Sequence, residues 1–247
     1  MSNYVLNPNL PSGKVLKIIC GINDKEILDF FIEKSIDVLR IEENSCIDSS
    51  VSLHADMAAL HLGGNMIIID KSQTQLKSEL EQLGFVVYEI SAAIKGKYPD
   101  DVRLNFTLVG DCAVGNFKHA DPVLLKQINN KKRIFVRQGY CKCSTLIVNE
   151  KAIITDDEGI FSKMRENGFD ALLISKGDIF LQGHDYGFIG GASGKISKDT
   201  VVFFGDITFH RDFEKINAFL SKYGCRYVCT DSRQLRDIGG FISLTEA

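Results

Sequence analysis

The feature that most constrains this chain is an amphipathic helical segment that recurs along its whole length. In each predicted helix, apolar residues recur every three or four positions, which places them on one face of a helix. A short apolar segment typical of a β-strand follows each helix. The predicted helices span residues 24–34, 72–83, 121–129, 157–167 and 211–223. This recurrence indicates a chain built from similar structural units.

The segments between the helices predict several strands per unit. The strands that directly follow the helices are expected at residues 36–41, 85–90, 133–138, 170–175 and 225–230. Gly84, Gly168 and Gly224 stand where a left-handed residue commonly ends a helix. After each of these strands come a polar loop and a further pair of apolar segments, except near the C-terminus, where DIGGFISLTEA supplies only one.

An extra predicted strand at residues 14–20 (KVLKIIC) precedes the first helix. We expect it to complete the fifth unit, because closing a ring of units removes exposed sheet edges. The predicted fold is therefore an α/β five-bladed propeller of ββαβ-type repeats, in one domain spanning residues 1–247. The alternative is an open doubly wound sheet. About three strand-like segments between helices, some paired like hairpins, favour mixed sheets and the ring.

Composition narrows the classes of partner. The chain has 29 Lys and Arg against 32 Asp and Glu, a net charge of −3, so we expect neither nucleic acid nor a membrane surface as a partner. The N-terminal segment lacks the basic start and apolar run of a signal peptide, and the apolar stretches are too short to span a bilayer. With seven cysteines and no secretion signal, we expect reduced thiols and a cytoplasmic protein. Whether the chain forms a homo-oligomer stays open.

Acidic residues recur at what look like equivalent places in the units. We expect Asp56, Asp185 and Asp237 each to open an equivalent strand, in DMAA, DYGF and DIGG, and Asn105 in NFTL holds the same place in the second unit. In a five-fold ring, equivalent positions would converge on a central funnel. Buried carboxylates need compensation, which a small guanidinium or ammonium ligand would supply. The alternative is that each Asp caps its own loop through backbone N–H groups.

Two histidines lie beside these aspartates, His54 in HAD and His184 in GHD. Histidine next to a carboxylate suits general acid–base chemistry. A metal held by His54, Asp56, His184 and Asp185 is conceivable. No Cys-x-x-Cys pair or His-x-x-x-His helix accompanies these residues, so we expect no metal and no cofactor.

The segment Cys141-Lys142-Cys143 is a third candidate for chemistry. If it is a strand, both thiols share one face and Lys142 faces the other way. A neighbouring cation can lower a thiol pKa, so Cys143 is a candidate nucleophile. The alternative is that both cysteines pack as small apolar core residues.

These features together resemble the pentein superfamily of guanidine-modifying enzymes, which includes deiminases, dimethylarginine hydrolases and amidinotransferases. The resemblance covers essentially the whole chain. It is carried by the five-unit pattern, the His-x-Asp and Gly-His-Asp elements, and the segments HADMAALHLGG, GYCKCS and GFIGGASG. More narrowly, these segments resemble a bacterial family of that fold whose function is unknown.

The resemblance implies a cysteine that attacks a guanidinium carbon, a histidine that transfers protons and carboxylates that hold the substrate. His184 is the best match to the family's catalytic histidine, and Asp56 and Asp185 to its substrate-binding carboxylates. The cysteine is expected at about Ser243 or Leu244, yet no cysteine follows Cys229. We therefore expect a funnel that binds a small cationic, guanidino or amino-acid-like ligand. The alternatives are a hydrolase or amidinotransferase whose relocated nucleophile is Cys143, assisted by His184, and a protein-interaction module resembling ribosome anti-association factors.

Overall fold

The computed structural model describes residues 2–247 and contains five small mixed sheets. In four of them, an antiparallel strand pair is followed by a helix that leads to a third strand, parallel to the second. The unit nearest the N-terminus with this order has β4 (Ala59–Gly63), β5 (Met66–Ile69), α3 (Thr74–Gln82) and β6 (Val86–Glu89). The others are β7 (Thr107–Val109), β8 (Cys112–Gly115), α4 (Pro122–Gln127) and β9 (Lys132–Phe135); β10 (Thr145–Asn149), β11 (Ala152–Thr155), α5 (Glu158–Glu166) and β12 (Asp170–Leu173); and β13 (Ser193–Ser197), β14 (Thr200–Phe203), α6 (Phe213–Lys222) and β15 (Arg226–Cys229).

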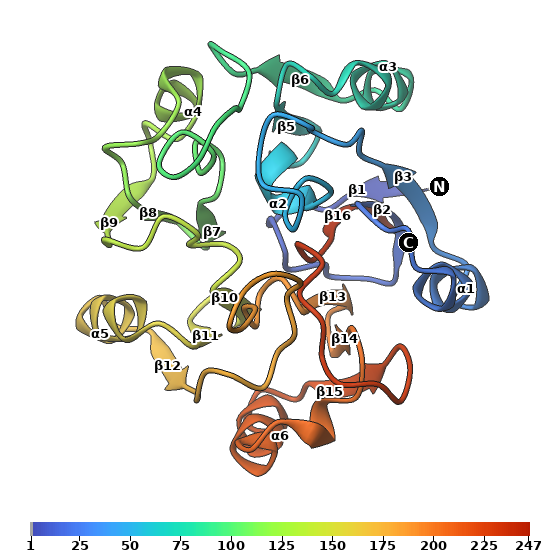
Figure 1. The fold of residues 1–247 in the computed structure, drawn as a ribbon, viewed down its shortest axis with the longest axis vertical. Coiled ribbons are helices and arrows are strands. Elements are labelled where there is room, and N and C mark those ends of the chain that lie inside the picture. Colours follow the sequence, from blue (N-terminus) through green and yellow to red (C-terminus); the bar gives the residue numbers. More distant parts are fainter. Residues whose placement is uncertain (1) are drawn as a thin grey trace.

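The remaining sheet joins the two ends of the chain. Its strands lie in the order β1 (Asn3–Tyr4), β16 (Ile242–Glu246), β2 (Val15–Cys20) and β3 (Asp37–Arg40), with α1 (Lys25–Glu33) between β2 and β3. The C-terminal strand β16 is antiparallel to β2, as β4 is to β5. The N-terminal strand β2 therefore pairs with the last strand of the chain, as the sequence predicted. Figure 1 shows the units arranged around a common centre, with the long helices at the periphery.

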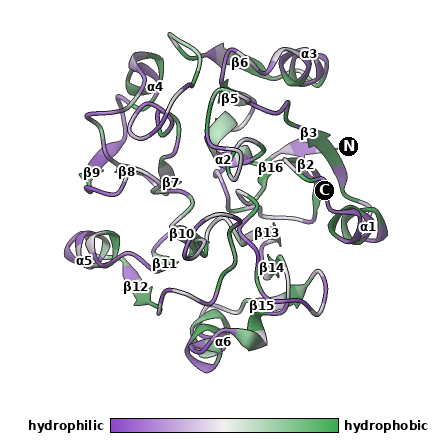
Figure 2. Cartoon of the chain, in the orientation of Figure 1, coloured by the Kyte–Doolittle hydropathy of each residue, from purple (hydrophilic) through white to green (hydrophobic). Residues whose placement is uncertain are grey.

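Local sequence explains where the helices begin and end. The side chain of Asp24 accepts the amide of Glu26 at the start of α1, and that of Asp157 accepts the amide of Ile160 at the start of α5. Gly168, with φ of 81°, follows α5 where a left-handed residue ends the helix. The helices carry both hydrophilic and hydrophobic residues in Figure 2, as expected when one face is buried.

The hydrophobic core lies between neighbouring units as well as within them. Ile19 on β2 and Leu39 on β3 share one buried cluster with Ile67 on β5 and Leu76 on α3. No unit could bury its apolar face alone, so the units depend on one another for stability. No helix within residues 2–247 has the length and apolar content needed to cross a membrane.

Candidate functional site

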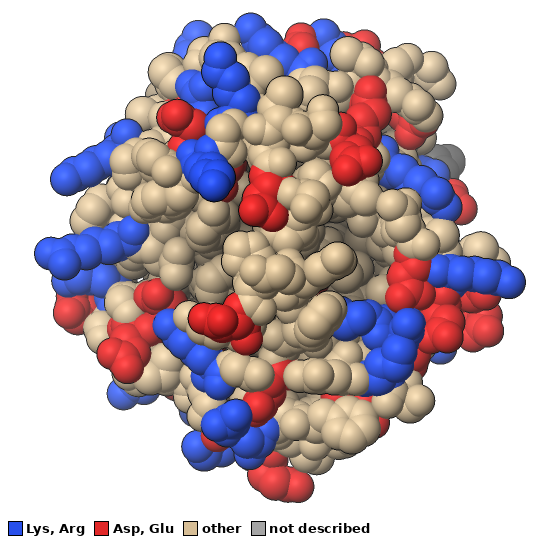
Figure 3. Space-filling model, in the orientation of Figure 1, with Lys and Arg blue, Asp and Glu red and all other residues tan. Residues whose placement is uncertain are grey.

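A pocket of about 420 Å³ opens among the loops that precede the first strands β4, β7, β10, β13 and β16. We call it the funnel pocket. Each of these loops contributes lining residues, so the pocket belongs to no single unit. Figure 3 shows that the middle of the face seen there is mostly uncharged and that many Lys and Arg side chains project from its outline.

The structure brings most of the sequence-predicted site residues to this pocket. Two of them, Asp56 and Asn105, are buried behind its wall and contact its base. Those that line it directly are His54, Cys143, His184, Asp185 and Asp237. Segments far apart in the sequence therefore meet at one place.

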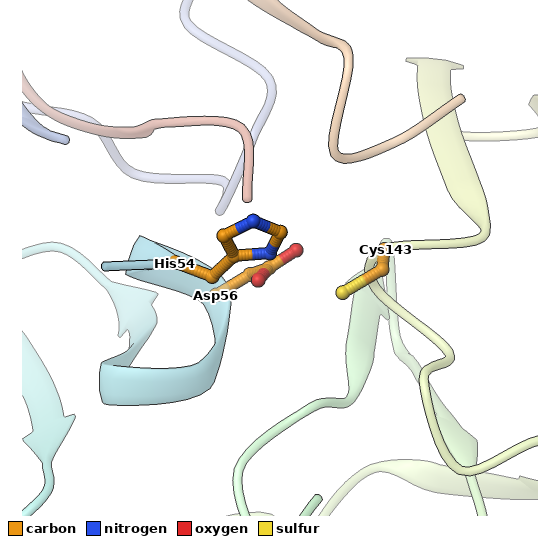
Figure 4. Close-up of side chains that lie close together, drawn as sticks. All are labelled: His54, Asp56 and Cys143. Atoms are coloured by element: carbon orange, nitrogen blue, oxygen red, sulfur yellow. The ribbon is translucent and has the colours of Figure 1, made fainter. Parts of the chain in front are cut away.

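At the base of the pocket, His54, Asp56 and Cys143 face one another (Figure 4). One potential ligand atom from each lies within 4.8 Å of the others, and all three residues are buried. His54 and Asp56 come from the single turn α2 (Ala55–Ala58) and its N-cap, whereas Cys143 comes from the turn before β10. Both carboxylate oxygens of Asp56 and Nδ1 of His54 are buried without an N–H or O–H partner in residues 2–247. The thiol of Cys143, a weak donor, lies beside the Asp56 carboxylate. Such unpaired groups are costly to bury.

Asp237 stands beside His54. Its carboxylate accepts the amides of Phe188 at 2.9 Å and Gly239 at 3.0 Å. Its Oδ1 lies 3.7 Å from Nδ1 of His54. Glycines make room for both side chains, because a Cβ at Gly191 would overlap the Asp237 carboxylate and a Cβ at Gly239 would overlap His54.

Asn105 holds the cysteine segment in place. Its side-chain oxygen accepts the amides of Lys142 at 2.8 Å and Cys143 at 3.2 Å. Its Nδ2 lies 3.1 Å from the carbonyl oxygen of Asp56 and 3.1 Å from Sγ of Cys143. Asn105 is fully buried, so these contacts fix the thiol relative to α2.

The predicted strand at Cys141-Lys142-Cys143 is wrong, because these residues form a turn. Asn105 accepts the amides that a strand would offer to a neighbour. The two thiols also diverge: Cys141 packs in a core cluster with Val109 and Ile147, while Cys143 faces the funnel pocket. Backbone hydrogen bonding to a buried side chain has overridden the local pattern.

Burial dominates the electrostatics at the base of the pocket. It raises the pKa of Asp56 from 3.8 to about 6, against the opposing effects of His54 and Lys142. Burial also raises the pKa of the Cys143 thiol well above its usual range, and the carboxylates of Asp56 and Asp237 add to this. A cation at this place would favour the ionised form of each group.

Aromatic rings form one side of the pocket, which the sequence pattern did not indicate. The ring of Tyr140 stacks on Phe188 with centroids 6.2 Å apart and lies 6.0 Å from Tyr98. The Tyr140 hydroxyl donates to Oδ2 of Asp101 at 2.6 Å, and Oδ1 of Asp101 is buried without a partner in the described chain. Burial raises the pKa of Asp101. The nearest sequence signal was Tyr140 within GYCKCS.

His184 and Asp185 lie at the rim rather than at the base. Both are exposed, and Nε2 of His184 lies 2.9 Å from Oγ of Ser50. The expectation that the acidic positions each open an equivalent strand is wrong. Asp56 lies in α2, which is a helical turn and not a strand. Asp185 lies in the loop before β13 and is further along the chain from β13 than Asn105 is from β7. Loops of different length bring residues from different depths to the same pocket.

Ser243, where the resemblance places the family's cysteine, does not line the funnel pocket. It lies on β16, and its Oγ donates to the carbonyl oxygen of Lys195 at 3.0 Å. It lines a separate small cavity together with Lys142. Among the described cysteines, the one that lines the funnel pocket is Cys143.

A family model described as DUF6873, a family of unknown function, matches residues 18–242. The chain belongs to this family. A search of curated proteins found no match to this DUF6873 chain.

Solved structures of guanidine-modifying enzymes match nearly the whole DUF6873 chain. SxtG, an amidinotransferase from Microseira wollei, has a TM-score of 0.57 at 9% identity and covers 91% of both chains. Agmatine deiminase from C. jejuni has a TM-score of 0.54 at 12% identity, with 93% of this chain and 91% of that chain covered. DDAH from Pseudomonas aeruginosa has a TM-score of 0.53 at 11% identity, with 89% and 93% covered. These matches confirm the predicted resemblance to pentein proteins at the level of the fold, which is a mixed α/β fold of small sheets.

The base of the funnel pocket in the DUF6873 chain offers two kinds of chemistry. Its carboxylates can hold an organic cation, while the thiol, imidazole and carboxylate of Cys143, His54 and Asp56 are donor types that bind metal ions. The neighbouring aromatic wall adds surface that favours cations.

Proposed function

We propose that this chain binds a small organic cation, of the guanidino or amino-acid-like kind, in the funnel pocket. The observation that carries the proposal is Asp56, a buried carboxylate whose two oxygens have no N–H or O–H partner in residues 2–247. It lies directly behind His54 and Cys143, which line the open pocket. A guanidinium group can donate two parallel hydrogen bonds to one carboxylate, and it would therefore supply a donor to each oxygen of Asp56.

Three neighbouring features support a cation over an anion or a neutral ligand. Asp237 places a second carboxylate beside His54. Asp101 adds a buried oxygen without a partner in the described chain. The rings of Tyr98, Tyr140 and Phe188 offer the faces to which cations are attracted.

We also propose that the five sheets form a closed five-bladed α/β propeller with the funnel pocket at one end of its axis. The pairing of β16 with β2, which makes the unit at the chain ends resemble the other four, supports this. So does the contribution of all five loops to one pocket.

Calorimetry and thermal shift with a matched panel test the ligand proposal. Arginine, agmatine and methylguanidine should bind and raise the melting temperature. Citrulline, whose ureido side chain carries no charge, should bind more weakly. Asp56→Asn should weaken binding by about 10- to 100-fold, the scale of a charged hydrogen bond. Asp29→Asn, an exposed change on α1, is the control. If a folded wild-type protein binds no cation of the panel, the proposal is wrong.

A second candidate function is covalent chemistry at Cys143, because its thiol lines the pocket within 4.8 Å of donor atoms on His54 and Asp56. In this reaction the thiol gives its proton to His54, the thiolate attacks the guanidinium carbon, and the leaving amine takes the proton back. Water or an acceptor amine then attacks the same carbon and gives its proton to His54. The Cys143 thiolate leaves and takes that proton, which yields a ureido or a new guanidino product.

A guanidine-directed electrophile, chloroacetamidine, tests this second candidate. Labelling should be confined to Cys143, blocked by arginine and absent in Cys143→Ser. Comparing His54→Ala with His184→Ala separates the histidine beside the thiol from the rim histidine that the resemblance favours. Equal labelling of several cysteines, with no protection by arginine, would remove the case for catalysis and leave binding.

A further inference from the structure

We infer that His54, Asp56 and Cys143 form a binding site for one transition-metal dication of the zinc class. The donor atoms of the three buried side chains lie within 4.8 Å of one another and converge in Figure 4. Within residues 2–247, no other group of three or more His, Cys, Asp and Glu side chains converges in this way. The inference does not rest on an organic ligand, although both ligands would use Asp56.

Unpaired polar atoms give an independent reason to expect an ion. Oδ1 and Oδ2 of Asp56 and Nδ1 of His54 are buried, and none has an N–H or O–H partner in the described chain. The thiol of Cys143, which lies beside Asp56, is only a weak donor. Buried carboxylates normally have a donor, a cation or a metal beside them. One ion between the three side chains would satisfy these atoms together.

The donor set selects the kind of metal. A thiolate sulfur, an imidazole nitrogen and a carboxylate oxygen suit Zn²⁺ and its substitute Co²⁺, whereas Mg²⁺ and Ca²⁺ prefer oxygen ligands. Zinc lies about 2.0 to 2.3 Å from such donors, so neighbouring donors in a tetrahedron are roughly 3.5 Å apart. Small rotations of the side chains would therefore close the set around an ion.

Neighbouring polar residues contact two of the three ligands, as hydrogen-bonding and charged neighbours do in metal sites. Nδ2 of Asn105 lies 3.1 Å from Sγ of Cys143 and would stabilise a thiolate. Asp237, held by the amides of Phe188 and Gly239, has Oδ1 3.7 Å from Nδ1 of His54, the nitrogen that faces the ion. Its negative charge therefore lies beside the site and would favour a bound dication.

Three protein ligands leave a fourth position open, and it would face the funnel pocket. This is the arrangement of zinc sites that bind a water or substrate, whereas purely structural sites have four protein ligands. The Cys143 thiol must lose its proton when the ion binds, so binding releases a proton. Because Asp56 would be a ligand, an organic cation and the metal would exclude each other.

Cobalt titration of the metal-free, reduced full-length protein tests the site. We expect one equivalent of Co²⁺ to bind with thiolate-to-cobalt charge-transfer absorption and the strong visible bands of four-coordinate cobalt, and Zn²⁺ to displace it. Cys143→Ser should abolish the charge-transfer band. Cys46→Ser, which removes an exposed free thiol, should retain it. Asp237→Asn, which removes a carboxylate charge beside the ion, should weaken affinity by about 10- to 100-fold with the spectrum retained.

The outcomes separate this inference from the proposed function. If wild-type protein gives no charge-transfer band, or if the band survives in Cys143→Ser, the metal site is wrong. Binding of arginine or agmatine in that case would leave the proposed function standing. A cobalt spectrum that depends on Cys143, in a protein that binds no organic cation, would support the metal and reject the organic ligand.

Discussion

Asn105 and Cys143 are joined twice: Nδ2 of Asn105 lies 3.1 Å from the Cys143 sulfur, and Oδ1 accepts the Cys143 amide at 3.2 Å. The same oxygen accepts the amide of Lys142. One buried side chain from the loop before β7 therefore shapes the turn before β10 and sets the position of the thiol.

Replacing Asn105 with Ala should destabilise the fold and release the thiol. The buried amides of Lys142 and Cys143 would lose their acceptor, and we expect a loss of about 2 to 4 kcal/mol in the free energy of unfolding, measured in urea. Asn65→Ala, which removes an exposed hydrogen bond to Gly84, should cost much less. Equal losses in the two variants would show that the Asn105 contacts are not important for stability.

Gly239→Ala should combine backbone strain with a steric clash. Gly239 has φ of 76°, and an added Cβ would overlap His54. Gly168→Ala is the matched control, because its φ is 81° and no atom lies within 4 Å of the new Cβ. We expect about 1 to 2 kcal/mol of strain in both variants, with a further loss and weaker Co²⁺ binding only in Gly239→Ala. Identical unfolding free energies and metal affinities would argue against close packing on His54.

Asp156 should make stability fall as the pH rises. Burial raises the pKa of Asp156 from 3.8 to about 7, against the opposing amide of Ile189 and charge of Lys176. Between these pH values the folded state holds a proton that the unfolded state has lost. The contribution of Asp156 to the free energy of unfolding is therefore largest below about pH 4 and is lost as the pH rises to about 7.

The expected contribution of Asp156 across that window is up to about 4 kcal/mol, from 1.36 kcal/mol per pKa unit. Asp156→Asn should flatten the dependence of unfolding free energy on pH between 4 and 7 and raise stability at pH 8 relative to wild type. Urea unfolding at several pH values measures this. An unchanged slope in the variant would mean that Asp156 titrates normally in the folded protein.

Tyr140→Phe should destabilise the pocket wall more at high pH than at low pH. The hydroxyl donates to Oδ2 of Asp101 at 2.6 Å, and Oδ1 of that carboxylate is already unpaired within residues 2–247. Losing the donor should cost about 1 to 3 kcal/mol when Asp101 is ionised, and less when it is protonated. Tyr186→Phe changes the same pocket without removing a hydrogen bond found in the described chain and serves as the control. A pH-independent loss would contradict this role for Tyr140.

Periodicity predicted the helices and strands because it reports local burial. The helix expected at residues 157–167 is α5, Glu158–Glu166, and the strand expected at 170–175 is β12, Asp170–Leu173. The use of residues 14–20 in the last unit also followed from the count of segments, since β2 pairs with β16. Each of these inferences needs only the spacing of apolar residues and the conformation of a few glycines.

The site itself was decided by tertiary structure. His54 and Cys143 are far apart in the sequence, and their meeting depends on how loops of unequal length reach the pocket. The same geometry leaves His184 and Asp185 exposed at the rim, although their motif is as clear as that of His54 and Asp56. A residue pattern records which groups are present and which face of an element they occupy. Only the packed units decide which of those groups are desolvated together, and burial together is what gives a carboxylate, an imidazole and a thiol their chemistry.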